Sequence, residues 1–250
     1  MLARMDILIS EEKGVRQLHF GTEWVQGAMR ISKPHALELE YTREMLLPLA
    51  LNANRHWPRN ALCIGLGVGA LPKFLLKHYP ACQVTVVEIS PAVLVVAQQH
   101  FKLPAQGPNL NVHIGCGAEY MATTQRQFDL VLVDGFDEKA RVGPLNSVPF
   151  YLNAKSRMAP GGCLSVNILS RQKDTEPGKQ RLQQAFDGQA LILPPCGSGN
   201  VIALAHSGEG FEDNLRSLKA NAEQLHANTG LNLMNSVVKF HQTLVLQSAA

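Results

Sequence analysis

The sequence lacks the spacings of cysteine and histidine that mark metal sites and redox motifs. Its five cysteines form no CxxC pair, and its nine histidines form no HxH or HxxxH pair. Protein ligands for zinc and similar ions usually come as closely spaced pairs of this kind, so we expect no metal site. An odd number of isolated cysteines is typical of reduced thiols, which indicates a cytoplasmic protein without structural disulfides.

Long apolar runs and clusters of one charge are also missing. The longest apolar run in the helix expected after residue 91 covers only residues 92–97, which is far too short to cross a bilayer. The first residues include Arg4, Asp6 and Glu11, an arrangement that does not fit a secretion signal. The formal net charge of +3 comes from scattered lysines and arginines, with no basic cluster longer than two residues. We therefore expect a protein that binds neither membranes nor nucleic acids.

The sequence does contain enough apolar material for a single α/β domain, because hydrophobic residues make up 46% of its 250 positions. From residue 60 onward, apolar stretches typical of buried strands alternate with helical stretches. Strands are expected over residues 61–64, 83–88, 110–114, 128–134, 163–169, 191–193 and 201–205, with helices over 71–78, from 91, and over 118–124, 148–158 and 211–227. This alternation predicts a doubly wound, mostly parallel Rossmann-like sheet.

The first 52 residues have a different rhythm. Residues 6–30 alternate in the manner of short antiparallel strands punctuated by glycines, and residues 36–51 have the pattern of an amphipathic helix. A segment of this size cannot bury a core of its own. We therefore expect residues 1–52 to form a β-hairpin and helix extension that packs on a main domain formed by residues 53–250.

A glycine-rich turn follows the first strand of the main domain. Gly65, Gly67 and Gly69 let the chain turn tightly and approach a ligand closely, and the next helix offers free N–H groups at its start. Glu88 ends the second strand, 19 residues after Gly69, where a carboxylate can accept hydrogen bonds from both hydroxyls of a ribose. The pattern predicts a nucleoside site, and Gly65-x-Gly67-x-x-Ala70 leaves an NAD-binding oxidoreductase open as an alternative.

Two carboxylates lie at the end of the strand expected over residues 128–134. Asp134 closes this buried strand and should emerge at the same crevice as the glycine turn, and Asp137 follows on the adjoining loop. Paired acids at a strand mouth suit binding a cationic amine and accepting its proton before nucleophilic attack. Asp134 is the candidate catalytic residue, and Asp137 is a candidate contact of the amine substrate.

These motifs together resemble the spermidine synthase (polyamine aminopropyltransferase) family, which has the class I methyltransferase fold. The resemblance covers roughly residues 7–205 and rests on Leu18-His-Phe-Gly, Trp24-Val-Gln-Gly27, Glu40-Tyr-Thr-Arg-Glu-Met45, Ile64-Gly-Leu-Gly-Val-Gly-Ala70, Val87-Glu88-Ile89 and Asp134-Gly-Phe-Asp137. It implies that Gln26 contacts the nucleoside and that Tyr41 lines the pocket. It also implies that Cys116 and Gly117 lie where the family contacts adenine, and that the protein forms a homodimer.

Two positions depart from the family pattern. The family's turn carries an aspartate that binds the amino group of decarboxylated S-adenosylmethionine, and this position is Val68 here. The family's adenine-contacting aspartate falls at Cys116. The leading prediction is a spermidine-synthase-like enzyme that transfers an aminopropyl group to a small-molecule amine. An S-adenosylmethionine-dependent methyltransferase and a nucleoside-binding protein without turnover remain the alternatives.

Overall fold

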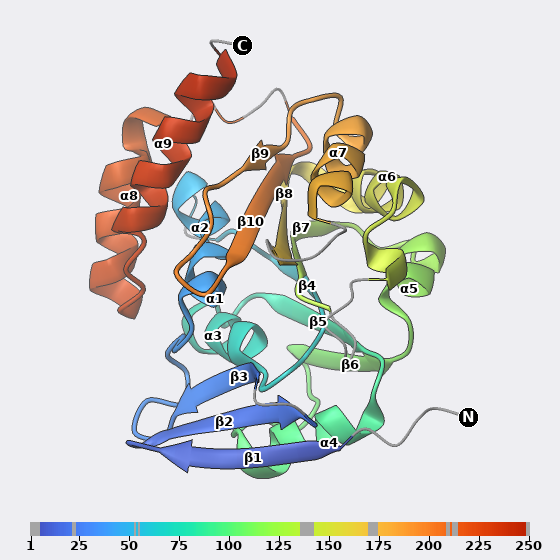
Figure 1. The fold of residues 1–250 in the computed structure, drawn as a ribbon, viewed down its shortest axis with the longest axis vertical. Helices are drawn as coiled ribbons and strands as arrows, with labels where there is room; N and C mark the ends of the chain where they lie inside the picture. Colours follow the sequence, from blue (N-terminus) through green and yellow to red (C-terminus); the bar gives the residue numbers. More distant parts are fainter. Residues whose placement is uncertain are drawn as a thin grey trace.

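The computed structural model describes residues 6–21, 24–52, 54, 56–135, 143–169, 175–208, 211 and 215–248. Its centre is a seven-stranded sheet in the order β6-β5-β4-β7-β8-β10-β9 (Figure 1). The strands are β4 (Asn60–Ile64), β5 (Gln83–Glu88), β6 (Leu110–Ile114), β7 (Phe128–Val133), β8 (Met158–Leu169), β9 (Leu191–Ile192) and β10 (Asn200–His206). Neighbouring strands from β6 to β8 are parallel, and β10 is antiparallel to both β8 and β9. The predicted doubly wound, mostly parallel sheet is confirmed.

Helices cover both faces of this sheet, as Figure 1 shows. The helices are α1 (Glu40–Glu44), α2 (Pro48–Leu51), α3 (Ala70–His78), α4 (Pro91–His100), α5 (Gly117–Thr123), α6 (Val148–Arg157), α7 (Thr175–Ala185), α8 (Leu215–Thr229) and α9 (Met234–Ser248), with a 3₁₀ turn, η1, over Gly143–Leu145. Two apolar cores result, because α1–α4, α8 and α9 pack on one face and α5–α7 on the other. Strands covered on both faces are apolar throughout, which explains the unbroken burial of Leu130, Val131, Leu132 and Val133 in β7.

The first three strands form a separate antiparallel sheet in the order β1-β2-β3. They are β1 (Ile7–Glu12), β2 (Val15–Phe20) and β3 (Val25–Arg30). Leu18 and Met29 of this sheet share an apolar cluster with Val68 of the glycine turn and Phe101 at the end of α4. The N-terminal sheet therefore packs directly against the segment that was expected to bind the nucleoside.

The single helix expected over residues 36–51 is wrong. The structure has two short helices, α1 and α2, separated at Met45–Leu47. Pro48 has no N–H to donate to the carbonyl of Glu44, four residues earlier, and its ring would clash with that carbonyl, so a regular helix is disfavoured at this point. The break turns α1 into a five-residue helix whose orientation depends on what surrounds it.

Three further differences concern the second half of the chain. β8 begins at Met158 rather than at residue 163, because an irregularity in its pairing with β7 accommodates Pro160-Gly-Gly162 inside the strand. α7 and α9 were not predicted. None of the helices that the structure describes combines the length and the apolar character needed to span a membrane.

Gly65 directly follows β4, and its backbone lies against that of Asp134, which directly follows β7. It has a φ of 92°, and a Cβ atom built on it would lie 2.2 Å from the carbonyl oxygen of Asp134. No side chain fits such a gap, because the neighbouring atom belongs to a backbone held in the central sheet. Glycine at this position therefore allows the ends of β4 and β7 to meet.

We expect Gly65→Ala to lower the free energy of unfolding by at least about 3 kcal/mol, since strain and a backbone clash add together. Gly14→Ala is the matched control, because Gly14 also has a positive φ (76°) but a Cβ atom there meets nothing within 4 Å. The control should lose only about 1–2 kcal/mol. Urea denaturation of both variants measures the difference, and equal losses would refute the steric role of Gly65.

Candidate functional site

The predicted site residues Gly65, Glu88 and Asp134 lie at the carboxyl ends of three adjacent strands, β4, β5 and β7. Backbone hydrogen bonds join these ends, from Gly65 N–H to the Val87 carbonyl (2.9 Å) and from Asp134 N–H to the Ile64 carbonyl (2.8 Å). Ligands of open α/β sheets bind outside the carboxyl ends of the strands, next to the point where strand order reverses. In this sheet the order reverses between β4 and β7, so these residues lie at that point.

The glycine turn presents backbone donors to this crevice. Gly65, Gly67 and Gly69 all have positive φ angles (92°, 51° and 68°), and Gly69 is the N-cap of α3. Within the described part of the chain, the N–H groups of Gly67 and Val68 have no hydrogen-bond acceptor. Donors at the start of a helix favour polar or anionic groups of a ligand.

Glu88 joins the turn to the second strand. Its carboxylate accepts hydrogen bonds from the N–H of Leu66 and the N–H of Ser90, both at 2.9 Å. Burial raises the pKa of Glu88, and the backbone N–H bonds oppose this effect. Each carboxylate oxygen accepts one of these bonds and keeps a second lone pair, so the group can still accept both hydroxyls of a ribose. The prediction for Glu88 is consistent with this geometry.

Two apolar side chains beside Glu88 were not predicted from the sequence. Ile89 directly follows Glu88 and is 54% exposed, and Ile114, which pairs with Glu88 in the sheet, is 41% exposed. Cys116 is half-buried and is the N-cap of α5, which starts with Gly117. Both isoleucines therefore leave apolar surface exposed at this strand end, and no local pattern in Val87-Glu88-Ile89 indicates this exposure.

Glycine at position 117 has a steric explanation, because α5 begins close to β4. A Cβ atom at this position would lie 2.4 Å from the side chain of Ile64, at the end of β4. The start of α5 therefore packs closely on the strand that carries the glycine turn. Cys116 and Gly117 lie beyond β6, on the same edge of the sheet as Glu88.

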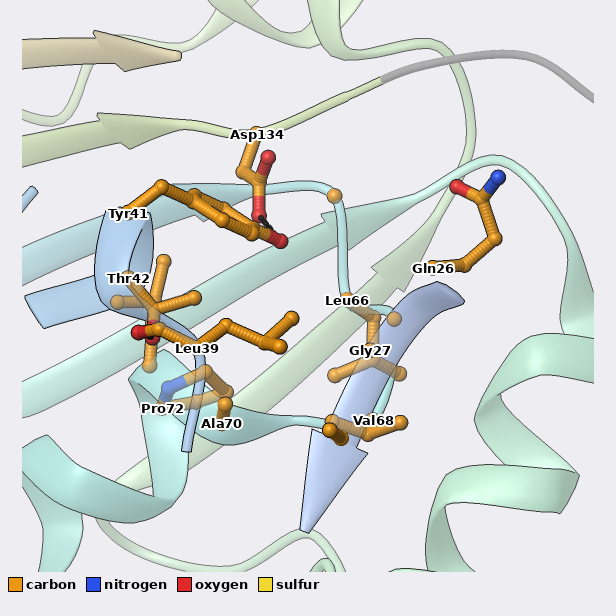
Figure 2. Close-up of a pocket in the computed structure, with 14 residues that line it drawn as sticks. Gln26, Gly27, Leu39, Tyr41, Thr42, Leu66, Val68, Ala70, Pro72 and Asp134 are labelled. Atoms are coloured by element: carbon orange, nitrogen blue, oxygen red, sulfur yellow. Dashed lines mark hydrogen bonds between the residues drawn. The ribbon is translucent and has the colours of Figure 1, made fainter. Parts of the chain in front are cut away.

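Asp134 is held by two side chains from different elements. Its carboxylate accepts a hydrogen bond from the Tyr41 hydroxyl (3.1 Å), drawn as a dashed line in Figure 2, and another from the Asn167 amide (2.8 Å). Burial raises the pKa of Asp134, while both hydrogen bonds favour the charged form and lower it. The pKa of Tyr41 is raised well above its usual value by burial and by Asp134, so its hydroxyl remains a donor.

Asn167 was missed by sequence reasoning. It lies on β8, is 2% exposed, and its side-chain oxygen accepts a hydrogen bond from Asn200 on β10 (2.9 Å). Asn200 in turn accepts from the Ser198 hydroxyl at 2.6 Å. A polar residue in an otherwise apolar strand is a usable sequence signal for a buried polar site, since buried amides occur where they have hydrogen-bond partners.

A pocket at this crevice is lined by Gln26 and Gly27 of β3, by residues 65–68 of the glycine turn, and by Tyr41 and Asp134. Figure 2 shows Gln26 well apart from the Tyr41–Asp134 pair. Val68 is 3% exposed, and a Cβ atom built on Gly27 would lie 2.7 Å from one of its methyl carbons. β3 therefore closes over Val68, and glycine at position 27 makes this possible.

Asp137 lies outside the residues that the structure describes, so its proximity to Asp134 stays a prediction. Among the described residues, no group of three or more histidine, cysteine or acidic side chains is arranged to hold a metal ion.

Known structures share this fold. A probable spermidine synthase from Corynebacterium glutamicum superposes with a TM-score of 0.73 at 17% identity, over 89% of this chain and 84% of that one. A spermidine synthase in complex with the transition-state analogue AdoDATO superposes with a TM-score of 0.69 at 18% identity, over 98% and 89%. These two structures show that the chain has the fold of the spermidine synthases, a mostly parallel α/β sheet of the methyltransferase type.

Sequence comparison gives the family. Residues 39–192 match the family described as the spermine/spermidine synthase domain. A polyamine aminopropyltransferase of Chromobacterium violaceum is 32% identical over 241 residues, which are 96% of this chain and 91% of that protein. The human eEF1A lysine and N-terminal methyltransferase is 30% identical over 148 residues, 53% of this chain and 21% of that protein. The chain belongs to the spermine/spermidine synthase family, as the sequence motifs indicated.

We expect Glu88→Gln to weaken binding of methylthioadenosine by about 1.5–3 kcal/mol, because ribose hydroxyls lose a charged acceptor. Asp129→Asn is the matched control, since the Asp129 carboxylate also accepts two backbone N–H groups, from Arg59 (2.7 Å) and Asn60 (2.8 Å), but at the opposite end of the sheet. Calorimetry measures both affinities. Unchanged affinity in Glu88→Gln would refute the ribose assignment.

Proposed function

We propose that the protein transfers the aminopropyl group of decarboxylated S-adenosylmethionine to a small-molecule amine. The observation that carries this proposal is Asp134, a partly buried carboxylate at the strand mouth beside the glycine turn, held by Tyr41 and Asn167. The identity to curated polyamine aminopropyltransferases over nearly the whole chain supports the same reaction.

In this proposal the adenosyl group lies along the carboxyl edge of the sheet. The turn from Gly65 to Gly69 supplies backbone contacts, and the ribose hydroxyls bind Glu88. Adenine lies against the exposed side chains of Ile89 and Ile114, with Cys116 and Gly117 at its edge, because a flat apolar ring is stabilised by covering exposed apolar surface.

The reaction then needs alignment and a neutral amine. The amine nitrogen attacks the methylene carbon next to the sulfonium, the carbon–sulfur bond breaks, and methylthioadenosine leaves as a neutral thioether. The proton lost by the amine passes to the Asp134 carboxylate, whose pKa is raised by burial. Holding amine and donor in line supplies much of the rate, because the step becomes effectively unimolecular. Asp137 is the proposed second contact of the amine.

A methyltransferase is the second candidate, and one observation favours it. Val68 occupies the position where the family's turn has an aspartate, and a valine cannot pair with the donor's ammonium group. The partial identity to the human eEF1A methyltransferase fits this alternative. Assays with both donors and a panel of amines separate aminopropyl transfer, methyl transfer and binding without turnover.

We further propose that the protein is a cytoplasmic homodimer. The support is the family resemblance together with the isolated cysteines, all of which are free thiols in the structure. Sedimentation velocity gives the oligomeric state directly.

We expect Asp134→Asn to lower kcat by roughly a hundredfold or more while affinity for methylthioadenosine stays nearly intact. The wild-type rate should rise with pH as Asp134 deprotonates. Because burial raises the pKa of Asp134, this rise should occur at a higher pH than for an ordinary aspartate, and the variant should lack it. Steady-state kinetics across pH tests both points. Near-normal turnover in Asp134→Asn would mean that the carboxylate is structural.

We expect Val68→Asp to increase the preference for decarboxylated over full S-adenosylmethionine by on the order of tenfold, since a carboxylate attracts the ammonium and repels the donor's α-carboxylate. The side chain is 3% exposed, so the variant should also melt at a lower temperature. Val68→Asn is the control for polarity without charge. If both variants show the same ratio in competition binding, residue 68 does not face the donor's tail.

A further inference from the structure

α1 carries Tyr41, but little within α1 itself stabilises this helix. It has five residues, no side-chain cap at its N-terminus, and Pro48 prevents its extension. A helix of this length is not stable by itself, because too few hydrogen bonds offset the cost of nucleation. Contacts with other parts of the chain must therefore fix the direction in which Tyr41 points.

One of these contacts is an ion pair whose carboxylate is buried and whose ammonium is half-buried. Glu44, three residues after Tyr41 on the same helix, is 1% exposed. Its carboxylate accepts hydrogen bonds from Lys239 Nζ (2.9 Å) and from the Ser236 hydroxyl (3.3 Å), both on α9. Cys196, in the segment between β9 and β10, lies 3.5 Å from the same carboxylate. Glu44 is thus enclosed by groups that come from the C-terminal third of the chain.

A second contact is made by Glu40, the residue before Tyr41. The carboxylate of Glu40 accepts a hydrogen bond from the backbone N–H of Gly197 (3.1 Å), next to Cys196. Glu40 and Glu44 are four residues apart and so lie on one face of α1. Both therefore attach α1 to the segment between β9 and β10, and Glu44 also attaches it to α9.

We propose that Glu44 and Lys239 are positioning residues of the active site, which fix α1 so that the Tyr41 hydroxyl donates to Asp134. Neither residue is among the described residues that line the pocket. Their role is to keep the 3.1 Å hydrogen bond between Tyr41 and Asp134 while substrates enter and leave. This inference rests on the proposed function for its kinetic consequences, although its structural consequence can be measured without turnover.

The charges around Asp134 and around Glu44 give the direction in which the pKa of Asp134 should change when α1 loses its position. Asp134 faces Tyr41 from α1, Asn167 from β8 and the Cys63 thiol of β4, whose pKa is raised mainly by burial and secondarily by Cys82 and Asp134. The Tyr41 hydrogen bond favours the charged carboxylate. Losing it must raise the pKa of Asp134 further, which moves the acidic limb of the rate to higher pH.

Around Glu44, the cation is Lys239, whose pKa is raised by Glu44, Cys196 and Glu40 despite the opposing effect of burial. The Cys196 thiol, whose pKa is about 12, stays neutral there. Lys239 is therefore the cation of this cluster, and its ammonium lies beside the side chains of Glu44 and Cys196.

The test is a double-mutant cycle between Glu44→Gln and Tyr41→Phe. We expect Glu44→Gln to lower kcat roughly five- to tenfold with little change in the KM of the nucleoside donor, and to have almost no further effect in the Tyr41→Phe background. Each of these two single variants should raise the pKa of Asp134. This pKa is measured by NMR titration of the side-chain carboxyl carbons in protein labelled at aspartate, and the Asp134 signal is assigned from its absence in Asp134→Asn. Additive losses in kcat, or an unchanged pKa in a folded Glu44→Gln protein, would overturn the proposal.

Two controls keep the result interpretable. Glu44→Gln combined with Lys239→Gln removes both charges without leaving one buried alone, so it tests the same point if the single variant does not fold. Asp187→Asn breaks the ion pair with Lys155 (2.6 Å), which lies on the other face of the sheet, and should leave kcat and the pKa of Asp134 unchanged. If wild-type protein turns over no donor, the proposed function fails, whereas the NMR titration still decides on the positioning pair.

Discussion

The contact between Gly65 and the backbone of Asp134 is the constraint on which the site depends. Two parallel strands can end side by side without their loops touching, but here the loops meet because one of them has no side chain at the crossing point. The contact places the glycine turn, which can hold a nucleoside, directly beside the carboxylate that can accept a proton. A transferase of this kind needs donor and nucleophile in line, and the separation between the two halves of the site is set by atoms of the backbone.

The N-terminal sheet forms one side of this crevice. Gly27 lies closely against Val68, so that an apolar side chain stands where the family pattern has an acid. The same sheet carries Gln26 to the rim of the pocket. The fit between β3 and the turn therefore shapes this side of the pocket together with residue 68.

Most of the sheet and half of the site could be predicted because they depend on local patterns. Apolar strands that end in Gly65, Glu88 and Asp134 must deliver these residues to one edge of a parallel sheet, whatever the rest of the chain does. α9 is not among the predicted helices, although the buried Val237 and Phe240 and the half-buried Leu244 have helical spacing. Asn167 stands out locally only as a polar residue in an apolar strand, and its contact with Asp134, like the Glu44–Lys239 pair, depends on a partner that only the folded chain brings near.

The distance along the sequence between Glu44 and Lys239 has a consequence for how the active site comes into being. The two residues are 195 positions apart, so during synthesis the carboxylate exists long before its ammonium partner. The central sheet and glycine turn can assemble from segments made earlier, whereas α1 obtains its last anchor only when α9 docks. On the ribosome, competence to hold a nucleoside would then precede competence to use it, and the growing chain would pass through a stage at which it binds without reacting.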